Sequence, residues 1–122
     1  MLTIKKEELN DKLNSFLKEI NCDENLHERI IMCAKDGEEY LGLGTLELNS
    51  GKVYLNFVKT KENDLSLKLG IMKSLLNLAD LRGIKMIYGN NSGLESLYKM
   101  LRFASENGEY ALKLEGYFTC GC

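Results

Sequence analysis

The stretch SLYKMLRF at residues 96–103 contains the residue best suited to chemistry, Tyr98. A phenol with an unperturbed pKa of about 10 can give a proton to a departing thiolate as a general acid. The same stretch has the pattern of the end of an amphipathic helix, in which Leu97, Leu101 and Phe103 lie beside the tyrosine. Tyr98 is therefore either a proton donor or a half-buried aromatic residue whose hydroxyl reaches water.

Cysteine and histidine, which bind metals and act as nucleophiles in many proteins, have no spacing typical of a site. The four cysteines are Cys22, Cys33, Cys120 and Cys122, and His27 is the single histidine. Cys120 and Cys122 are separated by one residue, not by the two of zinc knuckles, and no second clean pair accompanies them. We expect free thiols and no metal, with a thiol or metal function of the two C-terminal cysteines as the alternative.

Composition predicts one ordinary globular domain and excludes several classes of partner. The chain has 122 residues, of which 44% are apolar and 28% charged, and a domain of this length buries roughly two-thirds of the surface that its unfolded chain exposes. The 16 basic and 18 acidic residues are well mixed, so no basic face for nucleic acid is expected. The N-terminus lacks the apolar run of a signal peptide, and no stretch of about 18 apolar residues predicts a membrane span. We therefore expect a cytoplasmic protein without nucleic-acid or membrane partners.

Apolar periodicity predicts alternating strands and helices in a single domain of residues 1–122. The expected elements are a strand at 2–4, a helix at 6–20, strands at 29–35, 39–48 and 52–59, a helix from 65 to just before Gly83, a strand at 84–88, a helix at 93–103 and a strand at 110–118. Asp64 is the expected N-cap of the long helix, and Gly83 lies just past its end. This order, β-α-β-β-β-α-β-α-β, predicts an α+β fold (α/β-like) with a mixed, mostly antiparallel central sheet flanked by helices.

The order and several residues together resemble the GNAT-type N-acetyltransferases, which acetylate an amine with acetyl coenzyme A (acetyl-CoA). The last helix of that family usually carries Asn, a small residue three positions on, then Leu-Tyr, and ends in Gly-Phe. The corresponding residues here are Asn91, Leu94, Leu97, Tyr98 and Arg102-Phe103. The resemblance covers nearly the whole chain and implies the acyl-CoA N-acyltransferase-like fold.

The phosphate-binding loop of that family is degenerate in this sequence. It reads Arg or Gln, two residues, Gly, one residue, then Gly or Ala, and its N–H groups hold the pyrophosphate of the coenzyme. Leu67 replaces the Arg, Gly70 is kept, and Met72 replaces the second Gly, while the nearby Asp64 repels a pyrophosphate. The resemblance implies that Gly70, Ile71 and Met72 bind the coenzyme. Close helix–sheet packing of Gly70 and core packing of Met72 are the alternatives.

The resemblance implies three further roles. A backbone N–H near Phe57 and Val58 would hold the oxyanion, and the pantetheine arm of the coenzyme would pair with the same strand. Asn91 would bind pantetheine or cap the last helix. Tyr98 would be the acid, a contribution of roughly 10² to 10⁴ in rate. The sequence identifies no general base.

Two hypotheses follow from these residues. The first is an N-acetyltransferase that moves an acetyl group from acetyl-CoA to the amine of a small molecule or peptide by direct attack. The second is a GNAT-like binding or assembly module that has lost CoA binding and catalysis. The family has two helices before the second strand, but only one fits before Arg29 in this shortened N-terminal region. The acceptor pocket is therefore open, completed by a second subunit of a homodimer, or absent.

Overall fold

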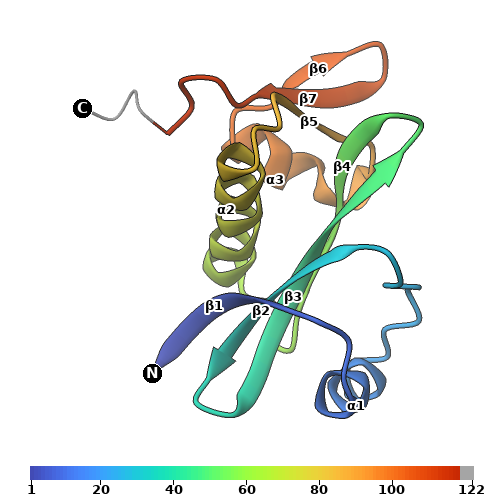
Figure 1. Cartoon of the computed structure of the whole chain (residues 1–122), viewed down its shortest axis with the longest axis vertical. Helices are drawn as coiled ribbons and strands as arrows, with labels where there is room; N and C mark the ends of the chain where they lie inside the picture. Colours follow the sequence, from blue (N-terminus) through green and yellow to red (C-terminus); the bar gives the residue numbers. More distant parts are fainter. Residues whose placement is uncertain (119–122) are drawn as a thin grey trace.

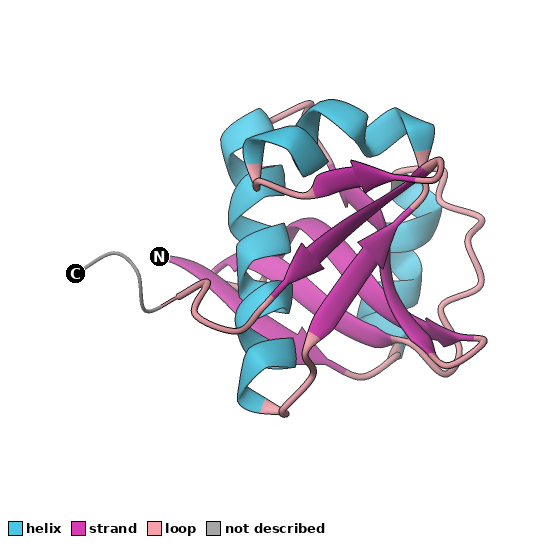
Figure 2. Cartoon of the chain, turned by 90° about the horizontal axis from the view of Figure 1, so that it is seen from above, coloured by secondary structure: helices cyan, strands magenta, loops and turns pink. Residues whose placement is uncertain are grey.

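The computed structural model describes residues 1–118, which form one seven-stranded sheet with helices on both faces (Figures 1 and 2). In chain order the elements are β1 (Leu2–Glu7), α1 (Asp11–Glu19), β2 (Ile30–Asp36), β3 (Glu39–Asn49), β4 (Lys52–Thr60), α2 (Leu65–Leu81), β5 (Met86–Gly89), the 3-10 helix η1 (Ser92–Leu94), α3 (Glu95–Met100), β6 (Ala104–Glu106) and β7 (Glu109–Lys113). Cys120 and Cys122, to which the thiol or metal hypothesis refers, lie outside the described residues.

The spatial order of the strands is β1-β2-β3-β4-β5-β7-β6. β4 and β5 are parallel, and every other neighbouring pair is antiparallel. The predicted mixed, mostly antiparallel sheet is therefore confirmed. Among residues 1–118, no helix is long and apolar enough to cross a membrane.

Several predicted elements differ in extent: β1 runs on to Glu7, and the helix expected at 93–103 is η1 followed by α3, which ends at Met100. The strand expected at 110–118 ends at Lys113, and it forms a hairpin with β6, which was not predicted. The turn between them is Asn107-Gly108, with φ of 52° and 80°, a strong hairpin sequence. The helix expected from residue 6 begins only at Asp11, because Asn10 caps it through Leu13 N–H at 2.9 Å.

Both ends of α2 are as predicted. The Asp64 side chain accepts a hydrogen bond from Leu67 N–H at 3.0 Å. After the helix, Gly83 has a φ of 79° and donates to Asp80 O, while Ile84 N–H donates to Ala79 O, both at 3.0 Å. These two bonds form a Schellman motif, which needs a left-handed residue at the glycine position.

α3 ends in the same motif but without a glycine. Arg102 N–H donates to Lys99 O at 3.1 Å and Phe103 N–H donates to Tyr98 O at 2.9 Å. Arg102 has a φ of 71°, a conformation that glycine adopts more easily. The family pattern has Gly at this position, and the geometry gives the reason.

The sheet separates two apolar clusters. α2 and α3 cover one face through a cluster that includes Leu55, Ile71 and Tyr98. α1 covers the other face, but its cluster reaches only as far as Phe57 of β4. Beyond it, the side chain of Tyr88 on β5 is only partly buried, because α1 is the one helix that precedes β2 in residues 1–29.

Candidate functional site

The parallel strands β4 and β5 diverge after a single residue pair, and we name the site of this divergence the fork. Tyr54 and Tyr88 are the pair that joins the two parallel strands. Past this pair β5 ends at Gly89, while β4 runs on to Thr60. The outer edge of β4 over residues 56–60 therefore has no neighbouring strand within residues 1–118, and an extended ligand could pair with it there.

A β-bulge lies in β4 at the start of this fork. The register with β3 passes from Glu47↔Tyr54 to Thr45↔Phe57, so that two residues of β4, Leu55 and Asn56, face one residue of β3. In a regular strand successive carbonyls point to opposite sides, but here side chains from the β5–α3 region bind both of them. The bulge thus exposes two consecutive carbonyls of β4 to the same part of the molecule.

Tyr98 is fully buried beside the fork. Its hydroxyl donates to Leu55 O at 2.7 Å, and its ring packs against Phe103 and Tyr110 with centroids 5.1 and 5.2 Å away. Gly89 makes room for it, because a Cβ there would overlap the phenol ring. Burial raises the pKa of Tyr98 to about 12. The alternative of a half-buried ring whose hydroxyl reaches water is therefore wrong, because the side chain is completely buried. The role of Tyr98 as a proton donor stays a prediction.

Three asparagines close the mouth of the fork. Asn56 Nδ2 donates to Asn90 Oδ1 at 2.7 Å, and Asn90 N–H donates to Asn56 Oδ1 at 2.8 Å. Asn91 Nδ2 donates to Asn56 O at 2.7 Å, while its Oδ1 accepts from Gly93 N–H at 2.9 Å and so caps η1. Asn91 thus caps η1, the turn that leads into α3, rather than the last helix itself as predicted, and it also contacts β4. We name Asn56, Asn90 and Asn91 the amide clasp.

The residues expected to form the phosphate loop lie inside α2. Gly70, Ile71 and Met72 are the sixth to eighth residues of this helix, so the helical hydrogen-bond ladder uses their N–H groups. Ile71 and Met72 are completely buried, and a Cβ on Gly70 would touch Ile4 at 3.4 Å. These residues therefore present no free loop to a pyrophosphate, and their packing agrees with the alternatives; their role in binding the coenzyme stays a prediction.

The start of α2 is also unfavourable for phosphate. Asp64 occupies the N–H of Leu67, and the hydroxyl of Thr60 accepts the N–H of Asp64 at 3.3 Å. The hollow of about 190 Å³ beside this helix start contains Glu62 and Asp64, together with Lys61. An anion placed here would meet more carboxylates than ammonium groups.

Phe57 and Val58 lie on β4 just past the fork, where the resemblance placed the oxyanion donor. They pair with Thr45 and Gly44 of β3. Phe57 packs toward the α1 cluster, and Val58 is buried under α2. Their place along the open edge fits the expected role, which stays a prediction.

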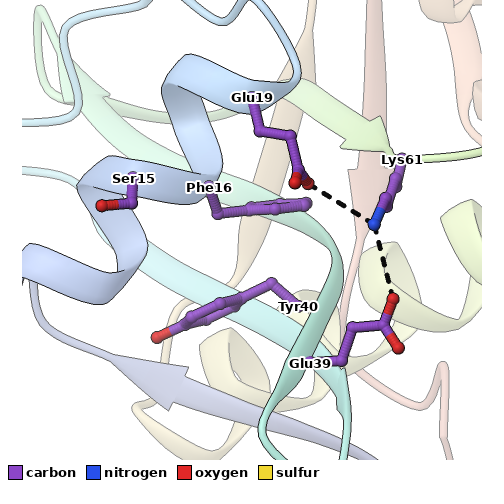
Figure 3. A pocket seen from close by; sticks show the side chains of 6 residues that line it. All are labelled: Ser15, Phe16, Glu19, Glu39, Tyr40 and Lys61. Atoms are coloured by element: carbon purple, nitrogen blue, oxygen red, sulfur yellow. Dashed lines mark hydrogen bonds and ion pairs between the residues drawn. The ribbon is translucent and has the colours of Figure 1, made fainter.

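A second hollow, of about 220 Å³, lies between α1 and β3 (Figure 3). Lys61 Nζ is 3.5 Å from Glu19 Oε2 and 3.4 Å from Glu39 Oε2, and the two carboxylates raise its pKa. Phe16 and Tyr40 stack with their ring centroids 5.4 Å apart. The stacked rings fasten α1 to the sheet, and the raised pKa keeps Lys61 protonated, so it does not serve as a base.

Comparisons with known proteins agree on the fold. No protein-family model and no curated protein sequence matches the chain. Solved structures do match. An N-acetyltransferase from Staphylococcus aureus Mu50 has a TM-score of 0.72 at 17% identity, over 94% of this chain and 99% of that one. A Bacillus subtilis acetyltransferase in complex with CoA has a TM-score of 0.64 at 19% identity, over 93% and 99%. A GNAT family acetyltransferase from Elizabethkingia anophelis with acetyl-CoA bound has a TM-score of 0.63 at 13% identity, over 92% and 97%.

The chain therefore has the fold of the GNAT-type N-acetyltransferases, as the sequence predicted. Within that fold, the sequence did not indicate Asn56 or Asn90. The bulge places Asn56 opposite residues far away in the chain, and no local pattern marks it.

Proposed function

We propose that the protein transfers an acetyl group from acetyl-CoA to an amine. The observation that carries the proposal is the fork, where the hydroxyl of Tyr98 reaches the backbone of β4 next to an unpaired strand edge. Two structures of the same fold contain CoA or acetyl-CoA. In the proposed complex the pantetheine arm pairs with the edge of β4 beyond Asn56, and a backbone N–H near Phe57 and Val58 faces the acyl oxygen.

In the proposed reaction the nitrogen lone pair of the amine attacks the carbonyl carbon, the C–S bond breaks, and the sulfur receives the electron pair; water takes the proton that the nitrogen loses and finally protonates the thiolate, which gives the amide and the thiol. Tyr98 then meets the new thiolate. With a pKa of about 12 against about 8.5 for a thiol, complete proton transfer from this phenol is uphill by roughly 5 kcal/mol. We propose that Tyr98 keeps its proton and stabilises the charge on sulfur through a hydrogen bond. To form it, the hydroxyl gives up its bond to the carbonyl of Leu55.

The structure of α2 has a consequence for how the coenzyme binds. Gly70, Ile71 and Met72 are helical and Asp64 lies at the helix start. Contacts between α2 and the pyrophosphate of the coenzyme would therefore contribute little to binding. We propose that binding depends mainly on the pantetheine arm, which pairs with the edge of β4 beyond the amide clasp. Acetyl-CoA and acetyl-pantetheine should then differ in Kd by less than about tenfold, or 1.4 kcal/mol.

The first experiment measures Tm and heats of binding with acetyl-CoA. Ligand at about 100 times its Kd adds roughly 2.7 kcal/mol to the free energy of unfolding, an upward shift of several degrees. Turnover with an amine mixture is then compared between wild type, Tyr98→Phe and Tyr117→Phe. The hydroxyl of Tyr117 donates to Leu101 O at 3.0 Å, so this variant loses a similar bond away from the fork. Equal turnover of the three proteins would remove Tyr98 from the mechanism.

The second candidate is a binding or assembly module of the same fold without CoA. The helical course of residues 67–72 favours it. The absence of any shift in Tm at millimolar acetyl-CoA, together with no binding heat, would support it over the enzyme. Rebuilding the loop is a poor test, because glycine in place of the fully buried Met72 would leave a cavity that costs about 2–5 kcal/mol.

A further inference from the structure

On the face of the sheet that α1 covers only in part, the area beyond α1 contains a hollow with the chemistry of an ammonium site. Its volume is about 240 Å³, and Lys52, Tyr88, Glu106 and Glu109 are among its lining residues. Ile87, next to Tyr88, is completely buried in the cluster beneath α2 and α3. Because side chains alternate along a strand, Tyr88 and this hollow lie on the opposite face.

The chain itself places an ammonium group in this hollow. Lys52 Nζ lies 4.7 Å from the ring centroid of Tyr88 and 3.5 Å from Glu109 Oε2. One aromatic ring and a carboxylate therefore contact the charge, and the ring of Tyr54 lies behind the first, with its centroid 5.9 Å from that of Tyr88. This is the combination that binds primary ammonium groups, through ring quadrupoles and Coulomb attraction.

The charges leave capacity for a further cation. Glu106 stands opposite Glu109 in the β6–β7 hairpin, so the hollow contains two carboxylates and one ammonium. Glu109 Oε1 is buried and has no hydrogen-bond partner. The contact with Tyr54 and the charge of Lys52 lower the pKa of Glu109, which keeps it ionised.

We infer that this hollow binds the alkylammonium group of an aliphatic amine, with Lys52 as its internal competitor. The side chain of Lys52 is 44% exposed. An ion pair at such an exposed position contributes little to stability, because water and salt screen it, so a ligand can displace the lysine.

The position of the hollow connects it with the fork. Tyr54 and Tyr88 form the last strand pair before the arms separate, and Tyr54 is followed by Leu55, which accepts the bond from Tyr98. If the proposed function holds, on which this step rests, the hollow binds an ammonium group of the acceptor other than the neutral amine that attacks the thioester, because a protonated nitrogen has no lone pair. The acceptor is then an aliphatic compound with at least two amino groups.

The test is an NMR titration with n-butylammonium chloride, a free copy of the lysine side chain, without any coenzyme. Concentrations to about 50 mM saturate a millimolar site. We expect saturable shifts at Tyr54, Tyr88 and Glu109, and no comparable shifts with n-butanol, which has the same carbon chain but no charge.

Four variants locate the binding. Lys52→Met removes the competitor and should tighten binding roughly two- to fivefold. Glu109→Gln should weaken it about tenfold or more, and Tyr88→Leu by roughly two- to fivefold. Lys99→Met is the matched control, because Lys99 also forms an exposed ion pair, 3.5 Å from Glu95 Oε1, but lies on α3 at the other face of the sheet. It should leave the Kd unchanged.

Three results would overturn the inference: no saturation with wild type and Lys52→Met, equal binding of n-butanol, or a Kd insensitive to both Lys52→Met and Glu109→Gln. Acetyl-CoA binding is measured separately. Butylammonium binding without acetyl-CoA binding would keep this site and reject the acetyltransferase, whereas the reverse result would keep the enzyme and reject the site.

Discussion

Replacing Gly89 with alanine is expected to disrupt the contact that holds Tyr98 at the fork. The new Cβ would overlap the ring and hydroxyl of Tyr98, and neither partner has room to move. Gly89 pairs with Tyr110 in the sheet, while the Tyr98 ring is fully enclosed and packs against Phe103. The clash must therefore be relieved by displacing the phenol from its bond to Leu55 O.

The size of the effect follows from these contacts. Overpacking a core costs about 1–3 kcal/mol, and a buried carbonyl that loses its donor costs about 1–3 kcal/mol more. We expect Gly89→Ala to lower the free energy of unfolding by about 2–5 kcal/mol in total. For 122 residues, each kcal/mol corresponds to a change in Tm of about 4 °C.

Urea denaturation and calorimetry measure this change, and two further proteins test its cause. Tyr98→Leu removes the ring, so adding Gly89→Ala to it should cost less than about 0.5 kcal/mol. Gly70→Ala is the control, because it adds the same atom within a helix at an ordinary contact distance. It should be neutral or stabilise by up to about 1 kcal/mol. A loss below about 0.5 kcal/mol for Gly89→Ala alone, or an equal loss in the Tyr98→Leu background, would refute the reasoning.

Three further predictions concern stability. Tyr98→Phe should cost about 1–3 kcal/mol in urea denaturation, because the buried Leu55 carbonyl loses its donor; a neutral result would mean that the bond is replaced. Arg102→Gly should raise the free energy of unfolding by about 0.5–1 kcal/mol, since φ is 71° there. Gly83→Ala, at a φ of 79°, should lower the free energy of unfolding. A lower urea midpoint for Arg102→Gly would contradict the proposed backbone strain. Burial raises the pKa of Cys33 from 9.0 and that of Tyr98 from 10.0, both to about 12. A raised folded pKa gives stability that is complete below the unfolded pKa and is lost as pH rises, so the urea midpoint should fall between about pH 9 and 12, and less steeply above pH 10 in Tyr98→Phe. A urea midpoint that does not change up to pH 12 would contradict the raised pKa values of Cys33 and Tyr98.

Features governed by neighbouring residues could be predicted from the sequence. Asp64 and Gly83 define α2 because a cap and a left-handed residue are local requirements. The alternation of side chains in β4 identified the strand but not its faces: it predicted Leu55 and Phe57 on one face, whereas the bulge places them in the clusters on opposite faces of the sheet. Asn107-Gly108 is an equally local signal for a hairpin, and it was missed because the expected last helix and last strand left no place for another strand.

The fork could not be predicted, because it depends on contacts between distant residues. The bulge at Leu55 and Asn56 is defined by its register with β3. The amide clasp joins Asn56 to residues 34 and 35 positions away. Asparagine is as common in turns as at such sites, so its presence alone indicates neither.

The residues that align with the phosphate loop were already expected to be helical. A loop at residues 67–72 needs a residue that stops the helix before Gly70, but Leu65, Leu67 and Leu69 all favour helix and the chain has no proline. With Asp64 as a cap, the helix therefore starts five residues before Gly70. The family motif thus predicted the fold, whereas the cap and the apolar periodicity predicted the local backbone.

The single-pair junction between β4 and β5 also divides the chain by folding order. Strands β1 to β4 are antiparallel, and tight turns join β2, β3 and β4, so most of their contacts are short in sequence and form early. β5 can join only after α2 has crossed over, and it is held there by Tyr54, Tyr88 and the bond between Tyr98 and Leu55. We therefore expect the part of the protein that completes the proposed site to assemble last. In native-state hydrogen exchange, β5 to β7 should open below the free energy of global unfolding, as a unit separate from the first four strands.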